Sequence, residues 1–217
     1  MQSLTDHNES TREAQDEVSE LNVVQSDALD ASEEQDDSES TIARELAENS
    51  SSEVVEEPKV SFDTFDLQKP LREAIDTLGF EFCTPIQAQS LVHTLQGHDV
   101  TGKAQTGTGK TAAFLITIIN DLLSNPIQEK RYLAEPRALI VAPTRELAIQ
   151  IASDADLLNK YSGLHTVTLV GGEDYQKQTR ALDARPVDIV VATPGRLLDF
   201  VSNGNLHLGT IELMVLD

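Results

Sequence analysis

The sequence predicts an α/β fold in which a parallel β-sheet is covered by helices on both faces. Two continuous apolar segments, residues 138–142 and 188–192, are typical of strands that are buried on both sides. Stretches with helical periodicity alternate with the predicted strands along the chain. A glycine-rich loop, residues 104–111, directly precedes an apolar run with helical character. In a sheet of this kind, ligands bind at the carboxyl ends of the strands.

The chain divides into two parts of different composition. Residues 1–60 hold 18 acidic and three basic residues, a net charge of −15, whereas residues 61–217 hold 19 and 13, a net charge of −6. The first part contains no aromatic residue, and such a segment cannot bury enough apolar surface to offset the entropy of ordering. We therefore expect a disordered acidic tail over residues 1–60. The tail is either a solubilising segment or an arm that binds partners or competes with nucleic acid for basic groups.

Several protein classes are disfavoured by composition. The N-terminus lacks the basic region and apolar core of a secretory signal, and the longest apolar run, residues 112–119, is shorter than the ~20 residues that span a bilayer. The single cysteine excludes an internal disulfide framework. We expect a cytoplasmic protein with no membrane partner and no metal cluster, since Cys83 and the histidines lack ligand spacing. The acidic net charge disfavours a nucleic-acid partner unless basic groups gather locally.

Apolar spacing and turn signals define the elements of the folded part. Leu71, Ile75 and Leu78 form a helix face that ends at Gly79, and Pro85 suits the first turn of a second helix. Further helices are predicted over residues 112–119, over residues 147–158 and after residue 195. Strands are predicted over residues 99–103, 138–142, 166–170, 188–192 and 211–216, although Gly102 and Lys103 have low strand propensity.

Residues 104–111 are predicted to form a phosphate-binding loop, because their closing Gly109-Lys110-Thr111 is the ending of the P-loop pattern. In this pattern, backbone N–H groups surround phosphate oxygens, Lys110 reaches the β and γ phosphates, and the Thr111 hydroxyl holds Mg²⁺. The helix that follows directs its positive end toward the anion. The alternative is a glycine-rich turn before an ordinary helix, and Ala104 stands where a glycine is usual. The predicted phosphate-binding residues are Ala104, Gln105, Thr106, Gly107, Thr108, Gly109, Lys110 and Thr111.

Polar residues in other loops suit nucleotide and nucleic-acid contacts. The amide of Gln87 can pair with both N6 and N7 of adenine, and an upstream aromatic such as Phe62 can stack on the base. Gln87 is otherwise a helix cap or a surface residue. Arg145 and Arg196 follow predicted strands and are suitable phosphate donors, although each is alternatively an ordinary surface arginine.

In order and separation, these motifs resemble those of the DEAD-box ATP-dependent RNA helicases. The resemblance extends from Phe62 to the last residue and implies the first RecA-like P-loop NTPase domain, with a Q motif over about residues 60–88. Within the family, residues 79–87 and 170–178 most resemble the helicases of the bacterial RNA degradosome. A degradosome endoribonuclease is therefore an implied partner.

The resemblance assigns a role to each motif. Phe62 and Gln87 would recognise the adenine of ATP, and the phosphate loop would bind its phosphates. Asp217 aligns with the first residue of the Asp-Glu-Ala-Asp motif, which implies contact with Mg²⁺ through water. The residues implied to hold the backbone of single-stranded RNA are Pro143, Thr144, Arg145, Gly171, Gly172, Thr193, Gly195 and Arg196.

The motif match also suggests what this polypeptide lacks. Asp217 is its last residue, so the Glu of the motif, the Ser-Ala-Thr segment and the second domain with its arginine fingers do not follow. We expect an N-terminal fragment, incomplete at its C-terminus, that binds ATP and RNA at most and hydrolyses nothing alone. An unpaired sheet edge should lower its stability. The alternatives are a non-catalytic nucleotide-binding, RNA-binding or partner-docking module, and a different P-loop ATPase such as a DNA translocase. Gln87 and residues 193–196 argue against the translocase.

Overall fold

A computed structural model describes residues 59–105, 107–127 and 130–217. These residues belong to one compact unit. Nearly all of the predicted acidic tail lies outside the described residues, as does Thr106 of the phosphate loop. The domain boundary near residue 60 therefore stays a prediction.

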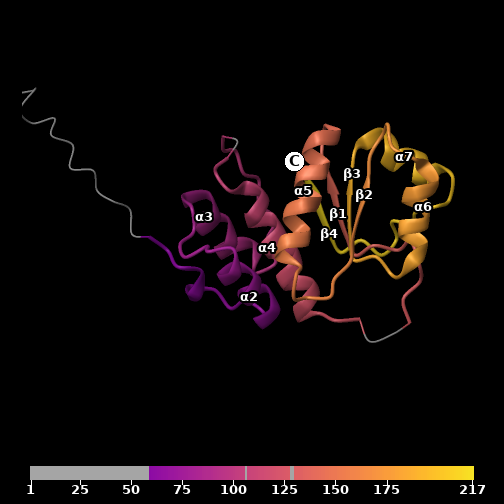
Figure 1. Cartoon of the computed structure of the whole chain (residues 1–217). Coiled ribbons are helices and arrows are strands. Elements are labelled where there is room, and N and C mark those ends of the chain that lie inside the picture. Colours follow the sequence, from indigo (N-terminus) through magenta and orange to yellow (C-terminus); the bar gives the residue numbers. More distant parts are fainter. Residues whose placement is uncertain (1–58, 106, 128–129) are drawn as a thin grey trace, which may run out of the picture. The chain divides into compact units, whose positions relative to one another are not determined.

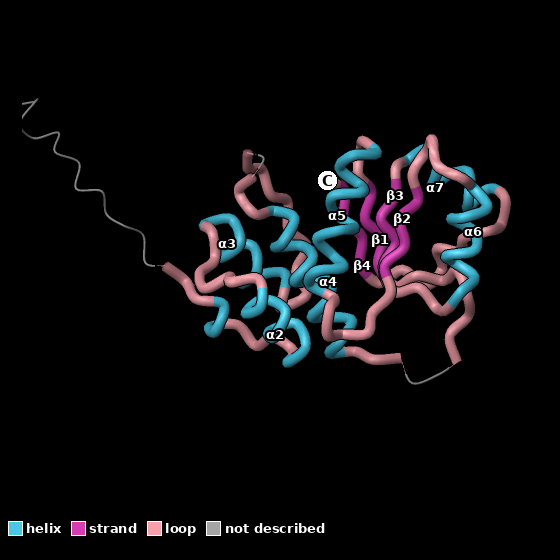
Figure 2. The backbone as a smooth tube through the Cα atoms, in the orientation of Figure 1, coloured by secondary structure: helices cyan, strands magenta, loops and turns pink. Residues whose placement is uncertain are grey.

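Four parallel strands form the sheet (Figures 1 and 2). They are β1 (Ala138–Val141), β2 (Thr166–Leu169), β3 (Ile189–Ala192) and β4 (Leu213–Leu216), in the order β2-β3-β1-β4. The register is continuous across the sheet, so that Ile140 of β1 lies beside Val191 on one side and Val215 on the other. The predictions of strands at these four positions are confirmed.

The predicted helices occur in the predicted order, and the described residues contain two further helices that were not predicted. A short 3-10 helix, η1 (Phe62–Thr64), precedes the α-helices. The α-helices are α2 (Lys69–Thr77), α3 (Pro85–Thr94), α4 (Lys110–Ser124), α5 (Arg145–Leu158), α6 (Tyr175–Ala184) and α7 (Pro194–Ser202). Both α2 and α3 carry proline in their first turn, where its missing N–H leaves no helical hydrogen bond unmade.

Alternate side chains of the strands enter two separate cores. Ile140 and Val191 belong to a cluster with buried residues of α4 and α5, while Leu139 and Val190 belong to a second cluster that includes Phe200 of α7. Figure 1 accordingly shows α4 and α5 on one side of the sheet and α6 and α7 on the other. The predicted α/β fold, a parallel sheet with helices on both faces, is confirmed.

Two sequence-based assignments need correction. Residues 99–103 were predicted as a strand and form none, because Gly102 and Lys103 disfavour extended pairing and no described strand lies beside them. Helix α6 was not predicted, since it is largely polar and buries only Gln178 and Leu182. Its presence follows from topology, because two parallel strands such as β2 and β3 need a crossover of a dozen or more residues.

The outer edge of β4 is open among the described residues. Met214 and Leu216, on the face of β4 opposite the first core, are 58% and 75% exposed. The predicted unpaired edge is therefore present. In the described ranges, no helix has both the length and the apolar character that crossing a membrane requires.

Candidate nucleotide- and RNA-binding site

The phosphate loop leads directly into α4. Gly107 and Gly109 have φ angles of +81° and +93°, in the left-handed region that favours glycine. Gly109 is the N-cap of α4 and makes no side-chain cap, so the first N–H groups of the helix stay open to an anion. The phosphate-binding role of the loop stays a prediction, with which these open N–H groups are compatible.

The side chain of Lys110 lies across this loop. Its Nζ donates hydrogen bonds to the carbonyl oxygens of Ala104 and, at 3.0 Å, Gln105. The hydroxyl of Thr108 donates to the same Gln105 oxygen at 2.7 Å. An ammonium has three donors, so one N–H of Lys110 remains for a phosphate oxygen.

Gln87 connects α3 to the phosphate loop. Thr84 and Gln87 form a capping box, in which the Gln87 side-chain oxygen accepts from the Thr84 N–H at 2.9 Å. Its Nε2 donates to the Gly109 carbonyl at 3.1 Å. The helix-cap interpretation is therefore correct. The adenine role stays a prediction, for which the amide retains one lone pair and one N–H.

The aromatic residues near Gln87 occupy different environments. Phe62 is 1% exposed, while Phe80 is 40% exposed and stacks on it with ring centroids 6.5 Å apart. Both rings border a cavity of about 370 Å³ that also includes Arg72. Phe62 is thus a core residue here, and its contact with adenine stays a prediction. Phe80 is not among the predicted site residues, although its position directly after Gly79 could have indicated it.

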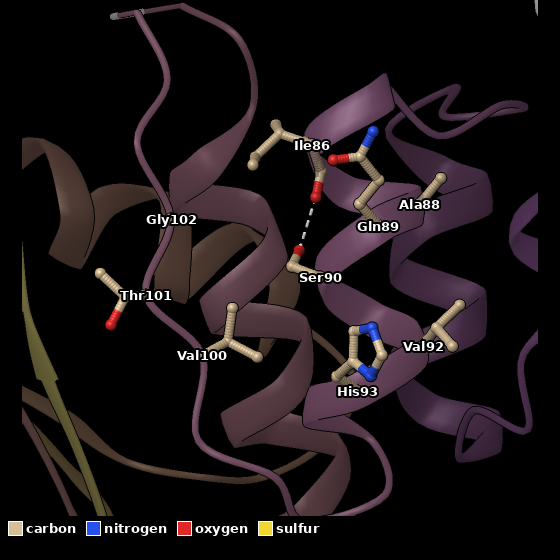
Figure 3. Close-up of a pocket in the computed structure, with 9 residues that line it drawn as sticks. All are labelled: Ile86, Ala88, Gln89, Ser90, Val92, His93, Val100, Thr101 and Gly102. Atoms are coloured by element: carbon tan, nitrogen blue, oxygen red, sulfur yellow. Dashed lines mark hydrogen bonds between the residues drawn. The ribbon is translucent and has the colours of Figure 1, made fainter.

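A larger cavity of about 580 Å³ lies elsewhere, between α3 and residues 100–102 (Figure 3). Ile86, Val92 and Val100 give it an apolar lining, and the Ser90 hydroxyl in its wall donates to the Ile86 carbonyl at 2.6 Å. None of its lining residues is a predicted site residue. We therefore place the candidate site at the loops, independently of this cavity.

A second group of predicted residues gathers in the loops that follow β1 and β2. Thr144 caps α5 by accepting from the Leu147 N–H at 3.2 Å, which leaves the hydroxyl proton free to donate. Arg145 donates to the Gly171 carbonyl at 3.1 Å and pairs with the Glu173 carboxylate at 3.0 Å. At Gly172, a Cβ would lie 2.8 Å from Nη1 of Arg145, so a side chain there would displace the guanidinium.

Arg196, in the first turn of α7 after β3, also contacts Glu173. Its Nη2 donates to the Glu173 carbonyl at 3.2 Å, and its guanidinium lies 5.5 Å from the ring centroid of Tyr175. Tyr175 in turn stacks on Phe200 at 4.3 Å. The N–H of Thr193 donates to the Leu169 carbonyl at 3.0 Å, which fixes the start of the loop. Two guanidinium groups from separate strand ends therefore meet around Glu173.

The remaining predicted residues also lie at strand ends. Pro143 and Gly195 are exposed, and no atom lies within 4 Å of a Cβ placed at Gly195. Asp217 is exposed after β4, and its N–H donates to the Val141 carbonyl at 3.0 Å. Among the described residues, no hydrogen bond joins Phe62 or Asp217 to the phosphate loop.

The oxygen donors in this region match the preference of Mg²⁺. The Thr111 hydroxyl and the Asp217 carboxylate are hard ligands of the kind that Mg²⁺ takes together with water and phosphate oxygens. Across the ranges that the structure describes, no group of three or more His, Cys, Asp or Glu side chains is placed to hold a metal ion by itself. The Mg²⁺-binding role of Thr111 and Asp217 therefore stays a prediction.

Comparison with known proteins identifies the family. The DEAD/DEAH box helicase family matches residues 84–217. The chain belongs to this family. It is 59% identical over 162 residues to the ATP-dependent RNA helicase RhlB of Pseudomonas putida, covering 75% of this chain and 41% of that protein. It is 53% identical over 156 residues to RhlB of Shewanella sediminis, covering 72% of this chain and 36% of that protein.

A solved helicase structure supports the same assignment. The hypothetical ATP-dependent RNA helicase from Sulfolobus tokodaii matches with a TM-score of 0.60 and 36% identity, over 70% of this chain and 41% of that chain. The predicted resemblance to the DEAD-box helicases and their RhlB group is confirmed. The chain spans less than half the length of these helicases.

Within this helicase domain, two residues beside the arginines were missed by the sequence analysis. Glu173 pairs with Arg145, and Tyr175 lies under Arg196. Both lie within four residues of Gly171, beside a turn that is predicted to contact the RNA backbone. A charged and an aromatic residue beside such a turn could have indicated these two site residues.

Proposed function

We propose that the chain binds ATP at the phosphate loop and single-stranded RNA at the strand-end arginines, as part of an ATP-dependent RNA helicase. The main supporting observation is that Arg145, at the start of α5, and Arg196, at the start of α7, both contact Glu173 although they are 51 residues apart in sequence. Guanidinium groups are the preferred partners of phosphate, so this convergence supports binding of a sugar–phosphate chain. The names of the RhlB relatives support RNA as that chain.

The nucleotide half of the proposal uses the loop and its neighbours. Lys110 would balance phosphate charge, Thr111 and Asp217 would hold Mg²⁺, and Gln87 would read the adenine edge. ATP supplies the phosphoryl group whose transfer releases RNA in the complete helicase. The chain's own contribution is to bind and orient that group.

The RNA half of the proposal is independent of base sequence. Its donors are the arginines, the Thr144 hydroxyl and backbone N–H groups at Gly171, Gly172 and Gly195, all of which suit phosphate and sugar oxygens. Binding one strand in this sequence-independent way allows local unwinding of any short duplex. We place this activity in cytoplasmic RNA turnover, with a degradosome endoribonuclease as the partner.

We expect the 217-residue polypeptide alone to bind nucleotide weakly without turnover. Phosphoryl transfer depends on positioned charges, and an arginine finger alone contributes about 10³–10⁵ in rate. Among the described residues, the arginines discussed above are proposed to bind RNA rather than to act as such a finger. Binding and catalysis should therefore be separable in experiments on this chain.

The test measures binding and turnover on the same preparation of residues 1–217. A fluorescent ATP analogue and a labelled oligo(U) should both bind, while ATP hydrolysis stays at background with and without RNA. Lys110→Ala should abolish nucleotide binding, and the double variant Arg145→Ala/Arg196→Ala should weaken RNA binding. Arg180→Ala, which removes an exposed arginine of α6, is the matched control. RNA-stimulated multiple turnover would refute the inactivity, and retained RNA affinity in the double variant would refute the RNA site.

The charge of the N-terminal segment favours a second, compatible role. Residues 1–60 carry a net charge of −15 and can compete with RNA for the arginines or bind a basic partner. If the segment competes, deleting residues 1–58 will raise affinity for oligo(U), most strongly at low salt. If the deletion leaves the affinity for oligo(U) unchanged at both 50 and 200 mM salt, the segment does not compete with RNA. Its role would then be solubilisation or partner docking.

A further inference from the structure

Glu173 contacts both arginines of the proposed RNA site, but through different atoms. Its carboxylate pairs with Nη2 of Arg145 at 3.0 Å. Its backbone carbonyl accepts from Nη2 of Arg196 at 3.2 Å. The side chain therefore restrains one arginine, and the backbone restrains the other.

The contact with Arg145 is one that a phosphate would replace. A carboxylate and a phosphate oxygen use the same N–H donors of a guanidinium. The side chains of Arg145 and Glu173 are 40% and 38% exposed, so their pair is open to solvent and weakly held. An incoming anion can displace the carboxylate without unfolding the loop.

The contact with Arg196 does not involve the Glu173 carboxylate. The backbone carbonyl of Glu173 stays in place, and Arg196 remains over Tyr175, which is fixed by Phe200 and by an Asn205 amide that donates to its hydroxyl at 2.9 Å. Nη1 of Arg196 is buried and has no hydrogen-bond partner among the described residues. A buried, unpartnered donor is unfavourable unless a ligand or water satisfies it.

We propose that the Glu173 carboxylate is a built-in competitor of RNA phosphate and sets the RNA affinity of this site. It holds Arg145 toward the loop after β2 until a phosphate takes its place, while Arg196 keeps its position. This inference rests on the proposed RNA-binding function. It predicts that removing the carboxylate strengthens RNA binding, although Glu173 belongs to the site itself.

The decisive experiment compares Glu173→Gln with Glu146→Gln. Glu146 is exposed, adjacent to Arg145 in sequence and in the first turn of α5, but forms no salt bridge with it. Both variants remove one negative charge near the site, so Glu146→Gln controls for general electrostatics. Binding of fluorescein-labelled oligo(U) to the full 217-residue chain is followed by anisotropy at 100 mM salt. Circular dichroism melts verify that each variant is folded.

We expect Glu173→Gln to raise RNA affinity about two- to fivefold, the range for releasing one exposed ion pair. Glu146→Gln should change it less than half as much. In an Arg145→Ala background, Glu173→Gln should raise RNA affinity no more than Glu146→Gln does, because the carboxylate then has no Arg145 to release.

The outcomes separate this inference from the proposed function. If the unmodified chain binds RNA and Glu173→Gln is equal or weaker, Glu173 orders Arg145 for RNA and the competitor proposal is wrong. If Glu146→Gln raises RNA affinity equally, the gain comes from the change in overall charge near the site, and the competitor proposal is also wrong. If neither the unmodified chain nor Glu173→Gln binds RNA, the proposed function fails and this inference with it.

Discussion

Gly109 closes the phosphate loop with a φ of +93°, and the side chain of Gln87 lies against it. A Cβ at this position would come within 2.4 Å of Gln87 Nε2 and 3.1 Å of Thr84 Oγ1. The backbone angle and the neighbouring amide therefore both require glycine. The loop and the capping box of α3 form one packed unit.

Gly109→Ala should consequently lose nucleotide binding as well as stability. Gly97 is a matched control, because its φ is +81° but no atom lies within 4 Å of its Cβ position. Gly97→Ala should lose about 1–2 kcal/mol of unfolding free energy from backbone strain, and Gly109→Ala should lose more, because its Cβ must also displace the Gln87 side chain. Only Gly109→Ala should also lose affinity for a fluorescent ATP analogue. Equal nucleotide affinity in the two variants would show that the Gln87 contact is unimportant.

Cys83 illustrates how burial alone changes the chemistry of a single residue. Desolvation raises the pKa of its thiol to about 11, against a smaller opposing effect of Arg72. The thiolate, which is the reactive form, is therefore scarce at neutral pH. At pH 8 we expect alkylation by iodoacetamide about 100-fold slower than for an ordinary thiol. The rate should keep rising with pH up to about 11. A plateau near pH 9 would contradict the shift.

Helix α6 is fixed to the sheet by a side chain that replaces a backbone partner. Gln178 is 5% exposed, and its amide both donates to the Val170 carbonyl and accepts from the Val170 N–H, each at 3.1 Å. Val170 is the residue before Gly171, so this pair holds the glycine turn in place. Helix α6, which was not predicted, thus positions Gly171 and Gly172, which were predicted site residues.

Gln178→Ala should destabilise the fold by about 2–4 kcal/mol, because it leaves two buried backbone groups without partners. Gln176→Ala removes an exposed glutamine from the same helix and should change stability by less than about 0.5 kcal/mol. Urea denaturation followed by circular dichroism measures both values. A loss below about 1 kcal/mol for Gln178→Ala would mean that water replaces the amide.

Across the whole molecule, the success of sequence-based prediction followed the type of signal. The strands that contain Ile140 and Val191 were predicted correctly, because buried parallel strands are continuously apolar. The prediction for residues 99–103 was wrong because strand formation there depends on an adjacent strand, and the sequence pattern does not indicate whether one is present. The Arg145–Glu173 pair spans 28 residues and forms only once β1 and β2 share a sheet edge. The sequence shows an arginine and a glutamate at these positions, but it does not show that they are in contact.

The open edge of β4 should govern how the molecule behaves in solution. An exposed strand edge with apolar side chains is a template for pairing with another chain. We expect concentration-dependent self-association in sedimentation velocity, and Met214→Lys should reduce it, because a charge on an edge strand disfavours pairing. Thr168→Lys, on the opposite edge strand β2, tests whether any added charge has the same effect. If the protein is monomeric at all concentrations, the open edge of β4 does not promote self-association.

The double attachment of Gln87 has an entropic consequence. A glutamine side chain that becomes immobilised only when a ligand binds costs about 0.5–1.5 kcal/mol of affinity. Here the amide oxygen is already fixed by the Thr84 N–H, and the amide nitrogen by the Gly109 carbonyl. That loss of freedom therefore occurs during folding. A base that pairs with the remaining lone pair and N–H would meet a rigid partner, so its discrimination would depend on shape rather than on the ordering of the side chain.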